Sequence, residues 1–68
     1  MSEIPVDVKR QVLLNEIREW EVGLYQLGIR HRVHKKLEAD QAELDKLVES
    51  MVRCEKAIDL LNSELAAL

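Results

Sequence analysis

The fold is decided by residues 36–44, which read KLEADQAEL. On both sides of this stretch the sequence is helix-forming, and no strand-like alternation of apolar and polar residues occurs. The only proline, Pro5, stands where the first turn of a helix tolerates it, because its missing N–H would have no partner there. The fold therefore depends on whether one helix runs through residues 36–44 or two helices meet there.

Apolar residues recur at alternating steps of four and three both before and after this stretch, as in coiled-coil seams. The first seam comprises Leu13, Ile17, Trp20, Leu24 and Leu27, continued by His31 and His34. The second seam comprises Leu44, Leu47, Met51, Cys54, Ile58, Leu61, Leu65 and Leu68. Continued past Glu38, the first seam falls on Gln41, Asp45 and Val48, so the two seams are out of register. One straight helix would therefore carry its apolar residues on one side before residue 38 and on a different side after it.

A chain reversal near residue 39 removes this conflict, because it brings seam against seam, with Leu24 facing Cys54. The sequence therefore predicts an all-α fold, a two-helix antiparallel coiled-coil hairpin. The first helix is expected at about residues 6–37 and the second at about 40–67, so that residues 1–68 form a single helical-hairpin unit. Trp20, as a seam residue, is expected in the core.

Local chemistry supports a reversal at residues 37–40. Asp40 followed by Glu43 fits a capping box, in which the Asp40 carboxylate accepts a hydrogen bond from the N–H of Glu43. A rival break is Gly28, which can end a helix in a left-handed cap. One continuous helix is the third alternative.

Composition limits the class of protein. A chain of 68 residues rarely builds a core that is stable alone, so a partner is expected. The single cysteine excludes an internal disulfide and indicates a reducing compartment. No signal peptide or membrane span is apparent, so a cytoplasmic protein with no membrane partner is expected. The net charge of -3 gives no overall attraction to nucleic acid.

Charge is unevenly divided between the two predicted helices. Residues 1–37 carry seven basic and five acidic side chains, or +2, whereas residues 38–68 carry three and eight, or -5. Opposite net charges favour side-by-side packing of the two segments, although exposed pairs contribute little each.

A second apolar row runs along the first helix, away from its seam. It comprises Val22, Tyr25, Ile29, Val33 and Leu37. A two-helix hairpin has one interface and cannot bury two rows, and a large exposed apolar patch usually marks an interaction surface. We therefore expect a structural or protein-interaction module that self-associates or docks on a larger protein. The simplest arrangement is a homodimer, in which two hairpins form a four-helix bundle.

The segment at residues 30–36 suggests an alternative function. Its four fixed positive charges are Arg30, Arg32, Lys35 and Lys36. Such a cluster could bind phosphate groups, as in a nucleic-acid-associated regulatory protein. Basic residues also suit the C-terminal end of a helix, where the carbonyl groups create negative potential.

No residue pattern indicates catalysis or a cofactor. His31 and His34 share a helix face at metal-compatible spacing, but the opposing seam offers only leucines, so no metal site is predicted. Cys54 is expected to face Leu24 as a structural thiol. Because the sequence has no phosphate-binding loop, nucleophile elbow or paired carboxylates, we do not expect an enzyme.

Overall fold

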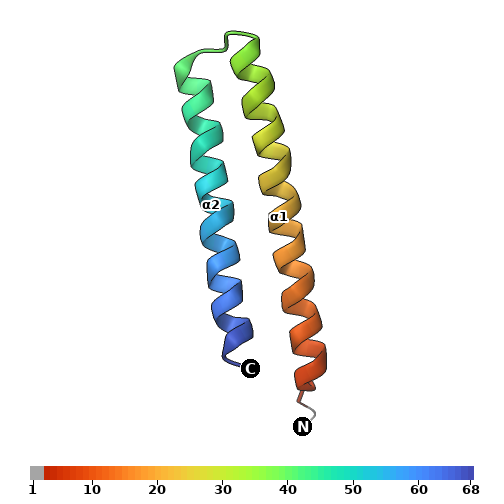
Figure 1. Ribbon diagram of the computed structural model, residues 1–68. Coiled ribbons are helices and arrows are strands. Elements are labelled where there is room, and N and C mark those ends of the chain that lie inside the picture. Colours follow the sequence, from red (N-terminus) through yellow and green to blue (C-terminus); the bar gives the residue numbers. More distant parts are fainter. Residues whose placement is uncertain (1–2) are drawn as a thin grey trace.

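The computed structural model describes residues 3–68 as an antiparallel pair of α-helices (Figure 1). Helix α1 runs Val6–Lys36, helix α2 runs Gln41–Ala66, and residues 37–40 join them. The predicted hairpin and its boundaries are thus confirmed to within one residue. Gly28 lies inside α1, so a break there is wrong, and so is one continuous helix.

The hairpin is long and thin, with Cα extents of 56 × 19 × 14 Å. In Figure 1 the turn lies at the top and both termini at the bottom, where α1 extends beyond α2. Within residues 3–68, neither helix contains a stretch long and apolar enough to cross a membrane.

The two predicted seams form the interface between the helices. Within α1 and α2, every buried or half-buried side chain larger than that of alanine belongs to one of the seams. A Cβ at Gly23 would lie 4.0 Å from the Sγ atom of Cys54. Because Gly23 adjoins Leu24, this distance agrees with the predicted facing of Leu24 and Cys54.

The core is thin. Of the described residues only Ile17 and Cys54 are buried apolar side chains, with 8% and 6% of their surface exposed. Two helices cover each other on one side only, so most seam residues keep an open edge and are half-buried. Trp20 remains 36% exposed despite its seam position, so its expected place in the core is wrong.

The chain leaves α1 through a Schellman motif. The Ala39 N–H donates to the His34 carbonyl oxygen at 2.9 Å, and the Glu38 N–H donates to the Lys35 carbonyl oxygen at 3.2 Å. Glu38 has a φ of 59°, a left-handed conformation that usually falls to glycine. A side chain destabilises this conformation by about 1–2 kcal/mol, so packing of the helices must offset local strain in the turn.

Asp40 is the N-cap residue of α2, as predicted, but the predicted capping box is wrong. The Asp40 carboxylate makes no capping hydrogen bond. The N–H groups of Glu43 and Leu44 instead donate to the main-chain carbonyl oxygen of Asp40, at 3.0 and 3.1 Å. Asp40 is exposed, so water competes with the backbone for its carboxylate.

No ion pair joins the two helices in the part of the chain that the structure describes. The one ion pair there, between Arg10 and Asp7 at 3.7 Å, lies within the first turns of α1. The side-chain hydrogen bonds likewise each span one turn of a single helix. The expected attraction between oppositely charged segments therefore forms no direct contact, and the register of the hairpin is set by its apolar seams.

Candidate functional site

The second apolar row predicted from the sequence lies on the surface of α1 and continues into the turn at Leu37, and we term it the outer stripe. It comprises Val22, Tyr25, Ile29, Val33 and Leu37. All five side chains are exposed, from 37% for Ile29 to 74% for Leu37. Successive residues of an α-helix are turned by about 100°, so Val22 and Ile29 lie on the side of α1 opposite its seam, with Tyr25 and Val33 to either side of them. Helix α2 therefore cannot cover these four residues.

The outer stripe has the chemistry of a helix-docking face. Its first four residues follow one another at steps of three, four and four, which is the spacing of anchor residues in helix-in-groove recognition. They are β-branched or aromatic, and Tyr25 alone adds a polar hydroxyl at 68% exposure. Such a row offers apolar area and shape to a second helix, but no group for chemical catalysis.

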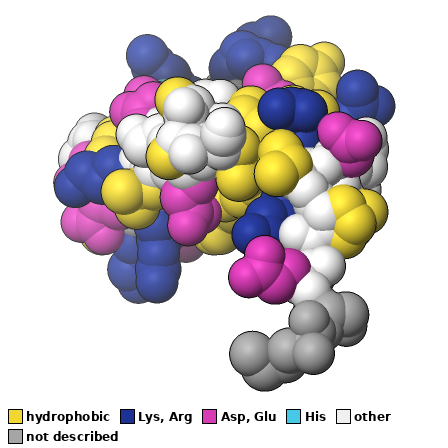
Figure 2. Space-filling model, turned by 90° about the horizontal axis from the view of Figure 1, so that it is seen from below, with side chains coloured by type: hydrophobic (Ala, Val, Ile, Leu, Met, Phe, Trp, Pro, Cys, Tyr) yellow, Lys and Arg dark blue, Asp and Glu magenta, His cyan; other side chains and the backbone are white. Residues whose placement is uncertain are grey.

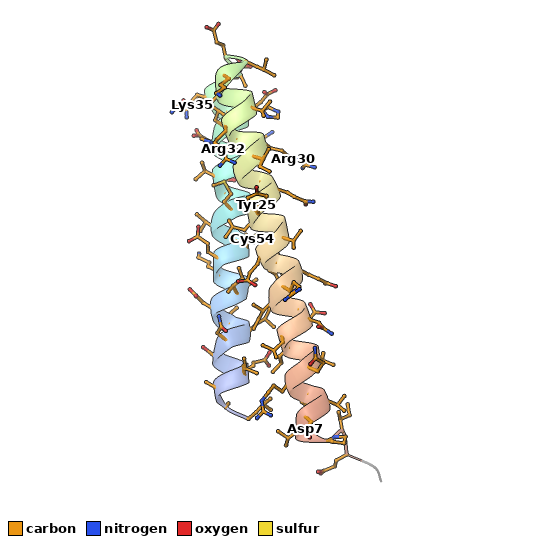
Figure 3. All side chains as sticks on the ribbon, turned by 45° about the vertical axis from the view of Figure 1, so that its right-hand side comes forward. Asp7, Tyr25, Arg30, Arg32, Lys35 and Cys54 are labelled. Carbon is orange, nitrogen blue, oxygen red and sulfur yellow. The ribbon has the colours of Figure 1, made fainter. Side chains whose placement is uncertain are left out.

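The four basic residues at 30–36 are exposed but do not converge on one face. At about 100° per residue, Arg30 and Lys35 are separated by about 140° around α1. Figure 3 shows their side chains extending from opposite sides of the helix. The Nη1 atom of Arg32 lies 3.7 Å from the position of a Cβ at Gly28, so its guanidinium folds back along α1. This arrangement spreads positive charge around the end of α1 and builds no phosphate pocket.

The two histidines are both half-buried on the seam near the turn. The Nδ1 atom of His34 lies 2.7 Å from the carbonyl oxygen of Arg30. Because a carbonyl oxygen only accepts, Nδ1 carries the proton and donates this hydrogen bond. Residues 3–68 contain no group of three or more His, Cys, Asp or Glu side chains placed to hold a metal ion.

Cys54 is a free cysteine in the middle of the interface. Its side chain is among the two most buried of the described apolar residues, and it packs beside Gly23 of α1. A buried thiol of this kind acts as a small apolar core residue. Figure 3 shows it between the two helices at mid-length.

A second apolar surface, which sequence reasoning missed, is a groove at the open end of the hairpin. It has a volume of about 420 Å³ and is lined chiefly by Ile4, Val8, Val12, Leu13, Ala67 and Leu68. Figure 2 looks onto this end and shows hydrophobic side chains gathered between the two helices. The signal was the unequal length of the helices, 31 against 26 residues, which leaves the start of α1 without α2 beside it.

The structure thus leaves the five predicted interface residues exposed, four of them within about 80° of one another around α1, and disperses the four basic ones. No protein-family model matches the chain, and neither the curated proteins nor the solved structures include a significant match. The outer stripe is a regular apolar row that the hairpin leaves exposed.

Proposed function

We propose that this protein is a non-enzymatic structural or protein-interaction module, which self-associates or docks on a larger protein through the outer face of α1. The observation that carries the proposal is the exposure of the outer stripe, whose residues recur with helical spacing on the side away from α2. Regular apolar spacing on an exposed helix face is what a covering helix requires.

Self-association is the form of the proposal that we favour. Two hairpins would form a homodimer of four helices. This assembly would supply the core that one hairpin lacks. The free thiol of Cys54 suits a reducing compartment such as the cytoplasm. Because the core of one hairpin has only two buried apolar side chains among the described residues, the hairpin alone has little stability. The free energy gained by packing against a second hairpin would be large by comparison.

The proposal is tested by placing a charge in the outer stripe. Ile29→Glu and Val33→Glu should each halve the mass measured by light scattering, because a carboxylate buried without a partner disfavours association. Circular dichroism should show unchanged helicity, since neither position packs against α2. Ser63→Glu, at an exposed position on α2, is the matched control and should leave the mass unchanged.

Two results would contradict self-association through the outer stripe. The first is a wild-type protein that is monomeric at concentrations well above those in a cell. The second is a dimer whose mass survives both stripe substitutions with helicity intact. In the first case the stripe would be left for a larger partner, and in the second another surface would form the dimer.

A further inference from the structure

We propose that the partner of the outer stripe is the outer stripe of a second copy, with the two α1 helices antiparallel. This inference rests on the proposed function and adds the identity and orientation of the surfaces that meet. The two α2 helices would then lie on the outside. The four helices form one layer, in the order α2, α1, α1, α2, in place of the closed four-helix bundle expected from the sequence.

The position of the stripe determines the layered arrangement. A closed bundle would need apolar residues on the flank that α1 and α2 share, beside the seam. Val22 and Ile29 of the stripe instead lie opposite the seam, at the farthest point of α1 from α2. A second hairpin that covers them therefore contacts α1 and stays away from α2.

The surface area of the hairpin leaves room for such a partner. The chain exposes 5710 Å². A compact monomer of its mass, 7.9 kDa, would expose about 4,400 Å² by the usual scaling of surface with mass. The excess, roughly 1,300 Å², is larger than the roughly 800 Å² that each partner buries in a standard interface. A second copy can cover that much area without disturbing the seam.

The stripe is complementary to itself when the helices run in opposite directions. A twofold axis midway between Leu27 and Gly28 places Val22 of one copy level with Val33 of the other. The same axis brings Tyr25 to within one residue of the level of Ile29 of the second copy. Each side of a twofold interface must match the other in this way.

Charge selects the antiparallel orientation over the parallel one. The charged side chains within about 90° of the outer stripe around α1 are Arg18, Glu19 and Glu21 near its start, or -1, and Arg30, Arg32 and Lys36 near its end, or +3. Antiparallel pairing brings each acidic end beside the basic end of the other copy, with Glu19 level with Lys36. Parallel pairing would place the two basic ends together. Because both orientations pair the apolar row, this difference decides between them.

Cysteine cross-linking tests the orientation directly. Val22→Cys and Val33→Cys are made as separate variants, one of them isotope-labelled, and are refolded together and oxidised. In the antiparallel dimer, position 22 faces position 33, whereas the two copies of position 22 are about 16 Å apart, beyond the reach of a disulfide. Mass spectrometry should therefore find a linked dimer in the mixture and none with either variant alone. The wild type is the control, because buried Cys54 should not cross-link.

Each other outcome overturns a defined part of the inference. Linked dimers from each variant alone would show parallel pairing and overturn the orientation, while the proposed function would stand. A dimeric wild type with no linked product in any sample would place the interface elsewhere. A monomeric wild type by light scattering would overturn the proposed self-association and this inference with it.

A charge exchange gives a second measurement that leaves the apolar row intact. Glu19→Lys or Lys36→Glu alone should weaken dimerisation roughly three- to tenfold in sedimentation experiments at low salt. The double variant should recover the wild-type dissociation constant, because the opposed charges are then exchanged between the helices. Additive losses in the double variant would overturn the antiparallel pairing.

Discussion

Ile17 and Ile29 are the same residue type, twelve positions apart on α1, yet Ile17 is 8% exposed and Ile29 is 37% exposed. Each belongs to a regular apolar row, Ile17 to the seam and Ile29 to the outer stripe. The rows differ in their direction around the helix, and only the direction of the seam meets α2. Regular apolar spacing therefore indicates that another helix can pack on a face. Whether the hairpin itself buries that face depends on where α2 lies.

The largest expected effect comes from truncating these two isoleucines in turn. Ile17→Ala should lower the free energy of unfolding by about 2–3 kcal/mol, because it removes buried methyl groups and leaves a cavity in a core with few buried side chains. Ile29→Ala should cost less than about 1 kcal/mol at a protein concentration low enough to keep the chain monomeric. Urea titrations followed by circular dichroism measure both values. Equal losses at low concentration would abolish the distinction between the two faces.

The turn joins the two helices, and its strain gives the next effect. Glu38→Gly should raise the free energy of unfolding by about 1 kcal/mol, because glycine takes a φ of 59° without steric cost. Thermal unfolding should show the rise in melting temperature. Glu38→Ala is the matched control, since alanine keeps the Cβ and should give a much smaller change. No gain from glycine would indicate that Glu38 is not left-handed in solution.

Gly23 lies beside the seam of α1, and its replacement by alanine tests how closely the two helices approach each other there. Gly23→Ala should stabilise the hairpin by about 0.5–1 kcal/mol, because alanine is the better helix former and its Cβ would meet Cys54 Sγ at an ordinary 4.0 Å. Hydrogen exchange of the amides around residue 23 should slow accordingly. A loss of stability would instead mean that the two helices approach each other more closely at Gly23 than the structure shows.

The smallest effect is expected at the start of α2. Asp40→Ala should cost less than about 0.5 kcal/mol, below the typical loss of about 1 kcal/mol for a capping side chain, because its carboxylate makes no capping hydrogen bond. Denaturant unfolding with Asp40→Asn as a second variant measures this difference. A loss near 1 kcal/mol for alanine and none for asparagine would show that the side chain caps α2 in solution.

Much of the fold could be predicted because heptad spacing is a local property. The mismatch of the two seams beyond Glu38 located the reversal, and the helix ends agree with it to within one residue. The sequence could not show whether the Asp40 carboxylate makes a capping hydrogen bond, because an aspartate can hold the N-cap position with its carboxylate turned to water. The left-handed Glu38 gave no sequence signal, since glutamate is an uncommon residue in that conformation.

Of the two candidate surfaces, one could be predicted from the sequence and the other could not. The five residues of the outer stripe were identified from their spacing alone, and the structure leaves all five exposed. The groove at the open end was missed, because it joins Val8 and Val12 of α1 to Leu68, which lies far away in the sequence. Trp20 was expected in the core because spacing does not reveal how little of an indole a two-helix interface can cover.

By itself, the sequence determined that the chain is helical, where it reverses and which two rows of side chains are apolar. These features follow from the order of residues within a few turns of one helix. The tertiary structure decided how deeply each row is covered, how the turn closes and where an open groove remains. Burial and grooves depend on what lies opposite a residue in space, and in this hairpin that is set by the length and register of a second helix.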